Sequence, residues 1–194
     1  MTPTRPAAPL LSARWLLTPW ARPLLGCAVV LLLTGLAQAQ SLTYGPLLGR
    51  GLTPDRMIVK WGTAADNDPT SLFVRPRGSA RPFLQIDGAA ARDHEVWVAG
   101  LVPGQSYEYF VTSGAARSAP ASFSTCPTQG MPLTVVFYGD SRGNPMNHAS
   151  VLAQVQRQGP DMVLESGDIA PLGQYSEYLA EFAPVTQELT ATTP

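Results

Sequence analysis

Two aspartates in the second half of this 194-residue chain stand where their carboxylates could do chemistry. Asp140 lies in Gly139-Asp140-Ser141-Arg142-Gly143-Asn144, and Asp168 lies in Gly167-Asp168-Ile169. Two carboxylates placed side by side repel each other, and a divalent cation between them removes that cost. Two such cations about 3.5–4 Å apart would hold an oxyanion and lower the pKa of a bound water. The pair therefore indicates metal chemistry, and Arg142 is a candidate for contacting an oxyanion or, alternatively, for pairing with a nearby acid.

The flanking segments predict that each aspartate follows a parallel strand. Residues 133–138 form a nearly continuous apolar run, which is typical of a strand buried on both faces, and residues 161–165 form a second strand. Between them we expect a helix capped by Asn147 and ended by Gly159-Pro160. A β-α-β unit gives two parallel strands, and ligands bind at the carboxyl edge of such sheets. The apolar side of this helix is predicted to carry Val151, Leu152 and Val155.

A second amphipathic helix is predicted after Asp168. Tyr175, Tyr178, Leu179 and Phe182 recur at helical spacing, and Pro184 is expected to end or kink the helix. His148 lies near the start of the first helix, where a surface position is the expectation and a position facing the site is the alternative.

Residues 42–125 have the pattern of short strands separated by turn-forming residues, with no helical stretch. Seven strands within about 85 residues indicate a β-sandwich. A linker follows at residues 126–132, after which the apolar periodicity changes. The strands with clear limits are predicted at residues 57–61, 71–75, 82–86, 94–98, 107–111 and 121–125.

The sequence Leu101-Val102-Pro103-Gly104-Gln105-Ser106-Tyr107 places a tyrosine at a fixed distance after a leucine and a Pro-Gly turn. A tyrosine there can bond its hydroxyl back to the upstream backbone, which is the tyrosine corner of β-sandwiches. The L-x-P-x-x-x-Y pattern resembles fibronectin type III domains, and Trp61 fits their core tryptophan. We expect Trp61, Trp97, Tyr107 and Tyr109 to pack in the core rather than to bind a ligand.

Residues 1–39 have the order of a secretory signal peptide. Their only charges are three arginines, an apolar run covers residues 24–37, and Ala37-Gln38-Ala39 is a small-x-small cleavage signature. The run is shorter than the roughly 20 residues that span a bilayer. We therefore expect a secreted or periplasmic protein cleaved near Ala39, with no stable anchor after cleavage; a membrane anchor, or lipidation at Cys27, is the alternative.

The chain has 13 basic and 14 acidic residues, so it lacks the excess of positive charge that is typical of nucleic-acid-binding proteins. Removal of residues 1–39 takes three of the arginines and none of the acids, which leaves a net charge of −4. One cysteine, Cys126, would then remain, so no internal disulfide is expected and stability must come from packing. We read Cys126 as a free thiol rather than a nucleophile.

The order of sandwich, linker, strand-Gly-Asp, helix and strand-x-Gly-Asp resembles the purple acid phosphatases and the wider metallophosphoesterase superfamily. The resemblance covers residues 42–194 and includes Tyr44-Gly45-Pro46-Leu47 near its start. It implies that residues 1–39 are a signal peptide and that residues 40–127 form a fibronectin type III-like domain. Residues 128–194 would then be the incomplete β-α-β-α start of an α/β metallophosphoesterase domain. It also implies Asp140 as a ligand of one metal and Asp168 as the carboxylate that bridges two, with iron, manganese or zinc as the dinuclear cofactor and a phosphate ester as substrate.

Two positions depart from the family pattern. Arg142 stands where many metallophosphoesterases have a histidine, although purple acid phosphatases also lack it. Pro171 stands where purple acid phosphatases carry a tyrosine that ligates ferric iron, and Tyr175 comes four residues too late. The sequence therefore indicates a tyrosine-free variant of the site, in which Arg142 either contacts the substrate phosphate or pairs with a nearby acid.

The family's Asn-His and later histidine motifs do not occur in residues 1–194, so the groups that complete both metal shells and supply the general acid are expected beyond residue 194. We expect this chain alone to be inactive, with a protease-resistant core that ends near Cys126. Two alternatives stay open: an exported non-catalytic β-sandwich that binds a partner, with a vestigial tail, and a chance pair of Gly-Asp loops in an unrelated α/β protein.

Overall fold

The computed structural model describes residues 41–194 with the exception of Leu52 and Asp68. The predicted signal peptide, its cleavage site near Ala39 and the alternative lipidation site at Cys27 lie outside the described residues. Within the described part of the chain, no helix is long and apolar enough to cross a bilayer.

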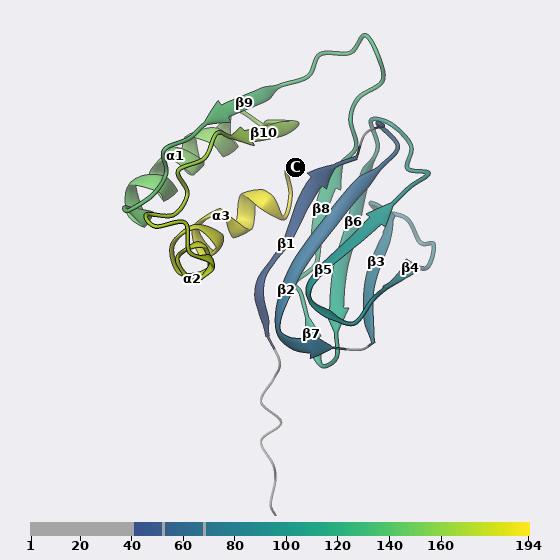
Figure 1. Ribbon diagram of the computed structural model, residues 1–194. Helices are drawn as coiled ribbons and strands as arrows, with labels where there is room; N and C mark the ends of the chain where they lie inside the picture. The colour runs from purple at the N-terminus through teal and green to yellow at the C-terminus, as the bar shows by residue number, and fades with distance from the viewer. Residues whose placement is uncertain (1–40, 52, 68) are drawn as a thin grey trace, which may run out of the picture. The chain divides into compact units, whose positions relative to one another are not determined.

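The first half of the described chain is a sandwich of two antiparallel sheets (Figure 1). One sheet has the order β1-β2-β5, and the other has the order β4-β3-β6-β7 with β8 paired to β6. The predicted β-sandwich is thus present, and each predicted strand falls within or overlaps an observed one. The bounds are β1 Leu42–Arg50, β2 Met57–Asn67, β3 Thr70–Pro76, β4 Leu84–Gly88, β5 Ala91–Val98, β6 Ser106–Ser113, β7 Ala116–Arg117 and β8 Ala121–Ser124.

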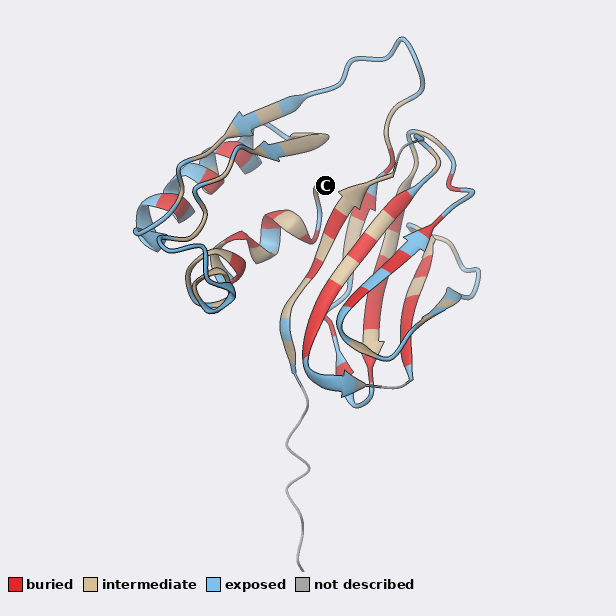
Figure 2. Ribbon diagram, in the orientation of Figure 1, coloured by how far each residue is buried: buried red, intermediate tan, exposed pale blue. Residues whose placement is uncertain are grey.

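Buried residues recur along the strands of both sheets (Figure 2), and their side chains form one apolar core. Successive residues of a strand point to opposite faces, so Met57, Val59 and Trp61 of β2 are all fully buried. Trp61 also donates its indole N–H to Ser113 Oγ at 3.1 Å, which satisfies its polar group inside the core. Tyr109 of β6 is equally buried, as predicted.

The tyrosine corner predicted at Tyr107 is present. Its hydroxyl accepts a hydrogen bond from the backbone N–H of Val102 at 2.9 Å, and the ring is buried against Phe123. The bond fixes the β5–β6 connection on the end of the sandwich.

Trp97 is not a core residue, and that prediction was wrong. Its side chain is 47% exposed, and its indole N–H donates to Glu95 on the same face of β5. His94, Val96 and Val98 take the inward positions, so the period of two places Trp97 on the solvent face.

The chain then forms a β-α-β unit with the parallel pairing that the sequence predicts. Strands β9 and β10 pair in parallel from Val135↔Met162 to Tyr138↔Glu165, with one helix between them in sequence. The remaining helical segments follow β10. The bounds are β9 Val135–Tyr138, α1 Pro145–Arg157, β10 Met162–Glu165, α2 Tyr175–Glu177, the π-helical segment η1 Tyr178–Phe182 and α3 Ala183–Thr190.

Two details of these helices differ from the prediction. Asn144, not Asn147, caps α1: its side-chain oxygen accepts the N–H of Asn147, and Pro145 occupies the first turn, where a missing N–H costs nothing. Val151 is 46% exposed, so the buried side of α1 consists of His148, Leu152 and Val155.

The helix that begins at Tyr175 does not end at Pro184. The π-helical segment η1 comes just before this proline, and α3 starts at Ala183 with Pro184 in its first turn. A π-turn changes the hydrogen-bond register, and a proline in a first turn removes no bond that the helix needs.

Helix α3 packs on strand β1 of the sandwich. The buried hydroxyl of Tyr109 donates to the carbonyl of Ala191, just after α3, at 2.8 Å. A second small core joins Leu152, Val155 and Leu189 with the inward side chains Val136 and Val163 of β9 and β10. The opposite face of this two-stranded sheet is uncovered, with Val135, Phe137 and Leu164 exposed by 42–68%.

Candidate functional site

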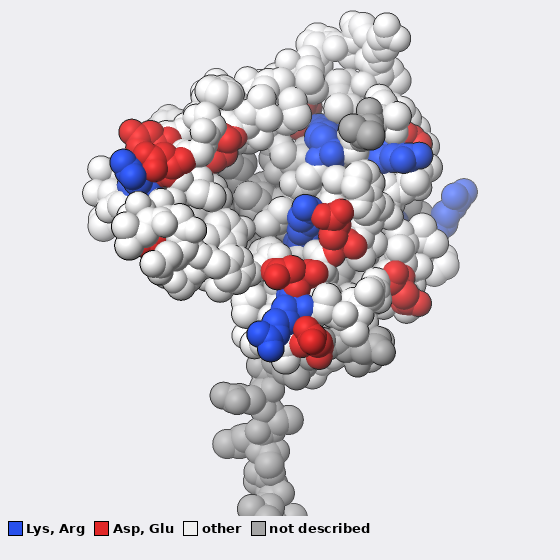
Figure 3. Space-filling view, viewed as in Figure 1, with Lys and Arg blue, Asp and Glu red and all other residues white. Residues whose placement is uncertain are grey.

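The two Gly-Asp loops lie against each other at the carboxyl ends of β9 and β10. The parallel pairing continues past the strands, because the N–H of Asp140 donates to the carbonyl of Gly167 and the N–H of Arg142 to the carbonyl of Asp168, both at 3.0 Å. The N–H of Ser166 likewise donates to the carbonyl of Tyr138 at 2.9 Å. Figure 3 shows acidic and basic side chains gathered at this end of the sheet.

Asp140 and Asp168 share an uncommon backbone conformation. Their φ angles are 55° and 60°, and they are the only non-glycine residues with positive φ in the described part of the chain. The left-handed conformation costs an L-residue roughly 1–2 kcal/mol, although aspartate tolerates it better than most residues. Residues held in such conformations cluster at functional sites. The backbone thus independently marks the two residues that the sequence singles out.

The glycines that precede the two aspartates, Gly139 and Gly167, are favoured for different reasons. A Cβ on Gly139 would collide with Ser166 Oγ and lie 3.2 Å from Ser166 Cβ, so any larger residue would force Ser166 to shift where the two loops meet. Gly167 has a φ of 103°, a conformation that L side chains rarely adopt.

Arg142 reaches across the loops to Asp168. Its Nε lies 3.0 Å from Asp168 Oδ2, and the two side chains are 48% and 42% exposed. Of the two readings of Arg142, the pairing with a nearby acid is the one that this structure contains. A guanidinium carries five N–H donors, more than one carboxylate can accept, so donors remain for an oxyanion.

Beneath the first loop lies a set of polar groups that the sequence reasoning missed. Ser141 Oγ donates to Glu165 Oε1 at 3.3 Å. Tyr138 is the partner of Glu165 in the parallel pairing of β9 and β10, and its hydroxyl oxygen lies 3.3 Å from His148 Nε2. Burial raises the pKa of the Glu165 carboxyl, and burial together with Glu165 raises the pKa of Tyr138. A carboxylate at the end of an otherwise apolar strand was the signal available in the sequence.

His148 is buried, contrary to the expectation of a surface position. It is 4% exposed and packs between the rings of Tyr138 and Phe182. Burial lowers its pKa, because the charged imidazolium is the form that loses hydration.

Tyr175 points away from the two loops. Its hydroxyl donates to Asp93 Oδ1 of the sandwich at 3.1 Å, and the hydroxyl of Tyr44 donates to the same oxygen at 3.0 Å. Tyr175 therefore joins α2 to the sandwich. Cys126 is a free thiol of intermediate exposure.

The described residues do not by themselves fit a dinuclear metal centre. Nowhere in residues 41–194, as far as the structure describes them, do three or more His, Cys, Asp or Glu side chains gather as a metal site would need. Asp168 is engaged by Arg142, and neither histidine is grouped with the two aspartates. Two carboxylates can contribute to such a centre but cannot complete its coordination.

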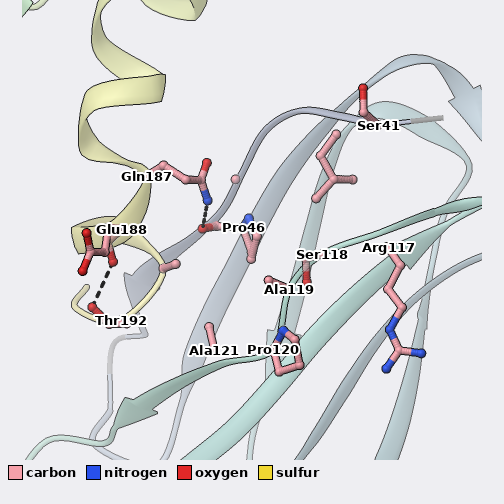
Figure 4. Close-up of a pocket in the computed structure, with 13 residues that line it drawn as sticks. Ser41, Pro46, Arg117, Ser118, Ala119, Pro120, Ala121, Gln187, Glu188 and Thr192 are labelled. Carbon is pink, nitrogen blue, oxygen red and sulfur yellow. Dashed lines mark hydrogen bonds between the residues drawn. The ribbon is translucent and has the colours of Figure 1, made fainter. Parts of the chain in front are cut away.

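One cavity is lined by the first of the two Gly-Asp loops, and a larger one has no lining residue in either loop. A small one of about 180 Å³ runs over the first loop and the start of α1, between Asp140, Arg142 and His148. A larger one of about 540 Å³ lies between α3, β1 and the β7–β8 connection (Figure 4). Its walls are formed mainly by small or apolar residues such as Pro46, Pro120 and Ala191, so the polar groups of the candidate site lie in the smaller cavity.

Comparisons with known proteins show a similarity of fold. No family model matches the chain, and no curated protein matches it. Among solved structures, the purple acid phosphatase PPD1 from yellow lupin (Lupinus luteus) seeds is similar with a TM-score of 0.64 at 16% identity, over 77% of this chain and 33% of that one. PhoD is similar with a TM-score of 0.54 at 16% identity, over 78% of this chain and 37% of that one. This chain therefore spans about a third of each of these structures and shares their fold over that part.

Proposed function

We propose that this chain is the exported N-terminal part of a metal-dependent phosphoester hydrolase of the purple-acid-phosphatase-like type. One observation carries the proposal: Asp140 and Asp168 lie on paired loops at the carboxyl edge of two parallel strands, both in a strained left-handed conformation. The similarity of fold to a purple acid phosphatase supports it.

In this proposal each residue has a defined part. Asp140 and Asp168 contribute carboxylate oxygens to the metal centre, and Arg142 binds the phosphate of the ester through the guanidinium nitrogens that Asp168 leaves free. Ser141 and Glu165 hold the first loop in place from below. Because the described donor set is too small, the remaining ligands and the general acid must come from further polypeptide.

Hydrolysis of p-nitrophenyl phosphate tests the proposal. The 194-residue chain is expected to give no turnover above background with added manganese, zinc or iron. The polypeptide extended by the coding sequence that follows codon 194 is expected to hydrolyse the ester, and Asp140→Asn or Asp168→Asn should lower kcat/KM by a factor of at least about 100.

Two outcomes would contradict the proposal. Turnover by the 194-residue chain that Asp168→Asn abolishes would show that its own donors suffice. An active extended polypeptide that tolerates both substitutions would place the chemistry elsewhere. Glu188→Gln, which removes one exposed carboxylate of α3, is the matched control and should leave the rate unchanged.

A second candidate function is that of an exported binding module without catalysis. The sandwich has a complete core of 13 buried apolar residues, whereas the β9–β10 sheet leaves one apolar face uncovered. An extended polypeptide without metal-dependent hydrolysis, combined with saturable ligand binding by the sandwich, would favour this function.

A further inference from the structure

One end of the sandwich contains a cavity that takes no part in the proposed hydrolysis. It has a volume of about 610 Å³ and is lined by the β3–β4 connection, the start of β4 and the β5–β6 connection. Cavities of about 300–1,000 Å³ are typical of small-molecule sites. None of its lining residues belongs to the Gly-Asp loops, and β4 is at the opposite edge of its sheet from β7.

The charge of this cavity has one sign. Arg75, Arg77 and Arg81 line it, and no aspartate or glutamate does, although acidic residues outnumber basic ones in the chain as a whole. Arg75 is neutralised by Glu108, with Nε and Oε1 2.7 Å apart. Arg77 and Arg81 form no ion pair with any residue that the structure describes. Two of the three arginines that line the cavity are therefore not compensated by an acidic side chain.

The turn that carries these arginines is fixed by hydrogen bonds. The N–H of Arg77 donates to the carbonyl of Ser106 at 2.9 Å, and the N–H of Ser79 to the carbonyl of Pro76 at 3.1 Å. At the other side, the N–H of Arg81 donates to Ser79 Oγ at 3.1 Å, while Arg75 Nη1 donates to the carbonyl of Arg81 at 3.3 Å. Because the turn is already ordered, a ligand that binds there does not have to order its backbone.

The same cavity has an apolar wall. Leu84 and Val102 line it and are 58% and 56% exposed, which is high for aliphatic side chains that face a hollow. Arg75 itself stacks on Phe83, with its guanidinium carbon 4.1 Å from the ring centroid. A ligand that fills the cavity would meet cations on one side and apolar carbon on the other.

We propose that this cavity binds a phosphate monoester of a small apolar alcohol. A monoester phosphate carries a charge of about −1.5 to −2 at neutral pH, which matches two uncompensated arginines, and guanidinium binds its oxygens in bidentate fashion. The organic group of the ester covers Leu84 and Val102. The same chemistry occurs in a soluble ester and in the headgroup of phosphatidic acid, and the size of the cavity favours the soluble ester.

The proposal is tested by titrating the full chain with phenyl phosphate and following amide chemical shifts. EDTA is present, so that metal chemistry is not involved. Saturable shifts are expected for residues 77–84 and 100–105, with none for residues 139–144 or 166–168. Absence of saturation, or shifts centred on the Gly-Asp loops, would overturn the proposal. Inorganic phosphate should bind more weakly than phenyl phosphate, and equal affinity would refute the role of the apolar wall.

Variants identify the groups responsible. The double variant Arg77→Gln/Arg81→Gln should raise the Kd for phenyl phosphate at least about tenfold at low ionic strength, and Arg77→Lys/Arg81→Lys should lie between it and the wild type. Arg92→Gln/Arg157→Gln removes the same charge outside the cavity and should leave the Kd within about twofold. If both Gln double variants weakened phenyl phosphate binding equally, the effect would come from net charge alone, and the proposed site would be overturned.

Vesicles distinguish the two sources of the phosphate. The chain is expected to sediment equally little with phosphatidylcholine vesicles and with vesicles that also contain phosphatidic acid. Sedimentation that requires phosphatidic acid and is lost in Arg77→Gln/Arg81→Gln, without binding of phenyl phosphate, would overturn the soluble ester. Failure of the hydrolase proposal leaves all of these measurements unaffected, because they need neither Asp140 nor Asp168.

Discussion

Arg142 Nε lies 3.0 Å from Asp168 Oδ2, so the arginine of the first Gly-Asp loop is held by the aspartate of the second. The backbone of the same two residues is joined as well, from the N–H of Arg142 to the carbonyl of Asp168. This double link sets the distance between the loops before any ligand arrives.

Arg142→Gln should change the free energy of unfolding by less than about 1 kcal/mol. Both partners of the ion pair are nearly half exposed, and solvent-screened pairs contribute little. Urea denaturation of the two proteins measures the difference. A loss of several kcal/mol would mean that Arg142 has a structural role that its exposed side chain does not indicate.

Glycine should be tolerated better than alanine at Asp168. Its φ of 60° is easy for glycine and costly for any residue with a Cβ, so Asp168→Gly should be about 1 kcal/mol more stable than Asp168→Ala. Both substitutions remove the ion pair equally, so the difference isolates the backbone. The same order is expected at Asp140, whose φ is 55°.

Gln156 provides a control of opposite sign for these substitutions. It is an exposed residue within α1, where glycine is less favourable than alanine by about 1 kcal/mol. If alanine equalled or exceeded glycine at both aspartates, the left-handed conformation would not be the native one.

Tyr109→Phe should weaken the attachment of α3 to the sandwich. The buried hydroxyl donates to the carbonyl of Ala191, and its removal leaves that carbonyl without this donor at a cost of about 1–3 kcal/mol. In limited proteolysis the wild-type chain should resist cleavage well beyond Cys126, in contrast to the expectation from sequence. In Tyr109→Phe, residues 183–194 should become accessible to cleavage.

Tyr175→Phe is the comparison for that experiment, since its hydroxyl makes an exposed bond to Asp93. It should alter cleavage less than Tyr109→Phe does. Rapid cleavage near residue 127 in the wild type would show that α3 does not hold the second half of the chain on the sandwich.

Stability should fall on acidification because of His94. Its imidazole is buried beside Trp61 and Thr63, and burial lowers its pKa below the ordinary value of about 6.5. Below that pH the unfolded chain takes up a proton that the folded chain does not, so the free energy of unfolding decreases as pH falls.

Comparison with His94→Gln isolates this contribution. The difference in free energy of unfolding between wild type and variant should be constant above about pH 7.5 and should shrink as the pH falls below about 6.5. His148, whose pKa burial also lowers, should behave alike, and His94→Gln/His148→Gln should lack both contributions. A difference that grows on acidification would mean that the protonated imidazole is stabilised by folding.

The sequence by itself determined the sandwich, because short strands separated by turn-forming residues recur over residues 42–125 with no helical stretch between them. It located the tyrosine corner at Tyr107, and it placed Asp140 and Asp168 after two parallel strands, since a β-α-β crossover has one favoured outcome. These features follow from local pattern and chain connectivity.

The tertiary structure decided what depends on contacts between distant segments. His148 is buried because it packs on Tyr138 and Phe182. Trp97 is exposed because its side chain lies on the solvent face of β5. The partner of Arg142, the support of Ser141 by Glu165 and the docking of α3 through Tyr109 all join residues more than 20 positions apart. No local pattern encodes such pairs, because each side chain had several chemically suitable partners until the fold selected one.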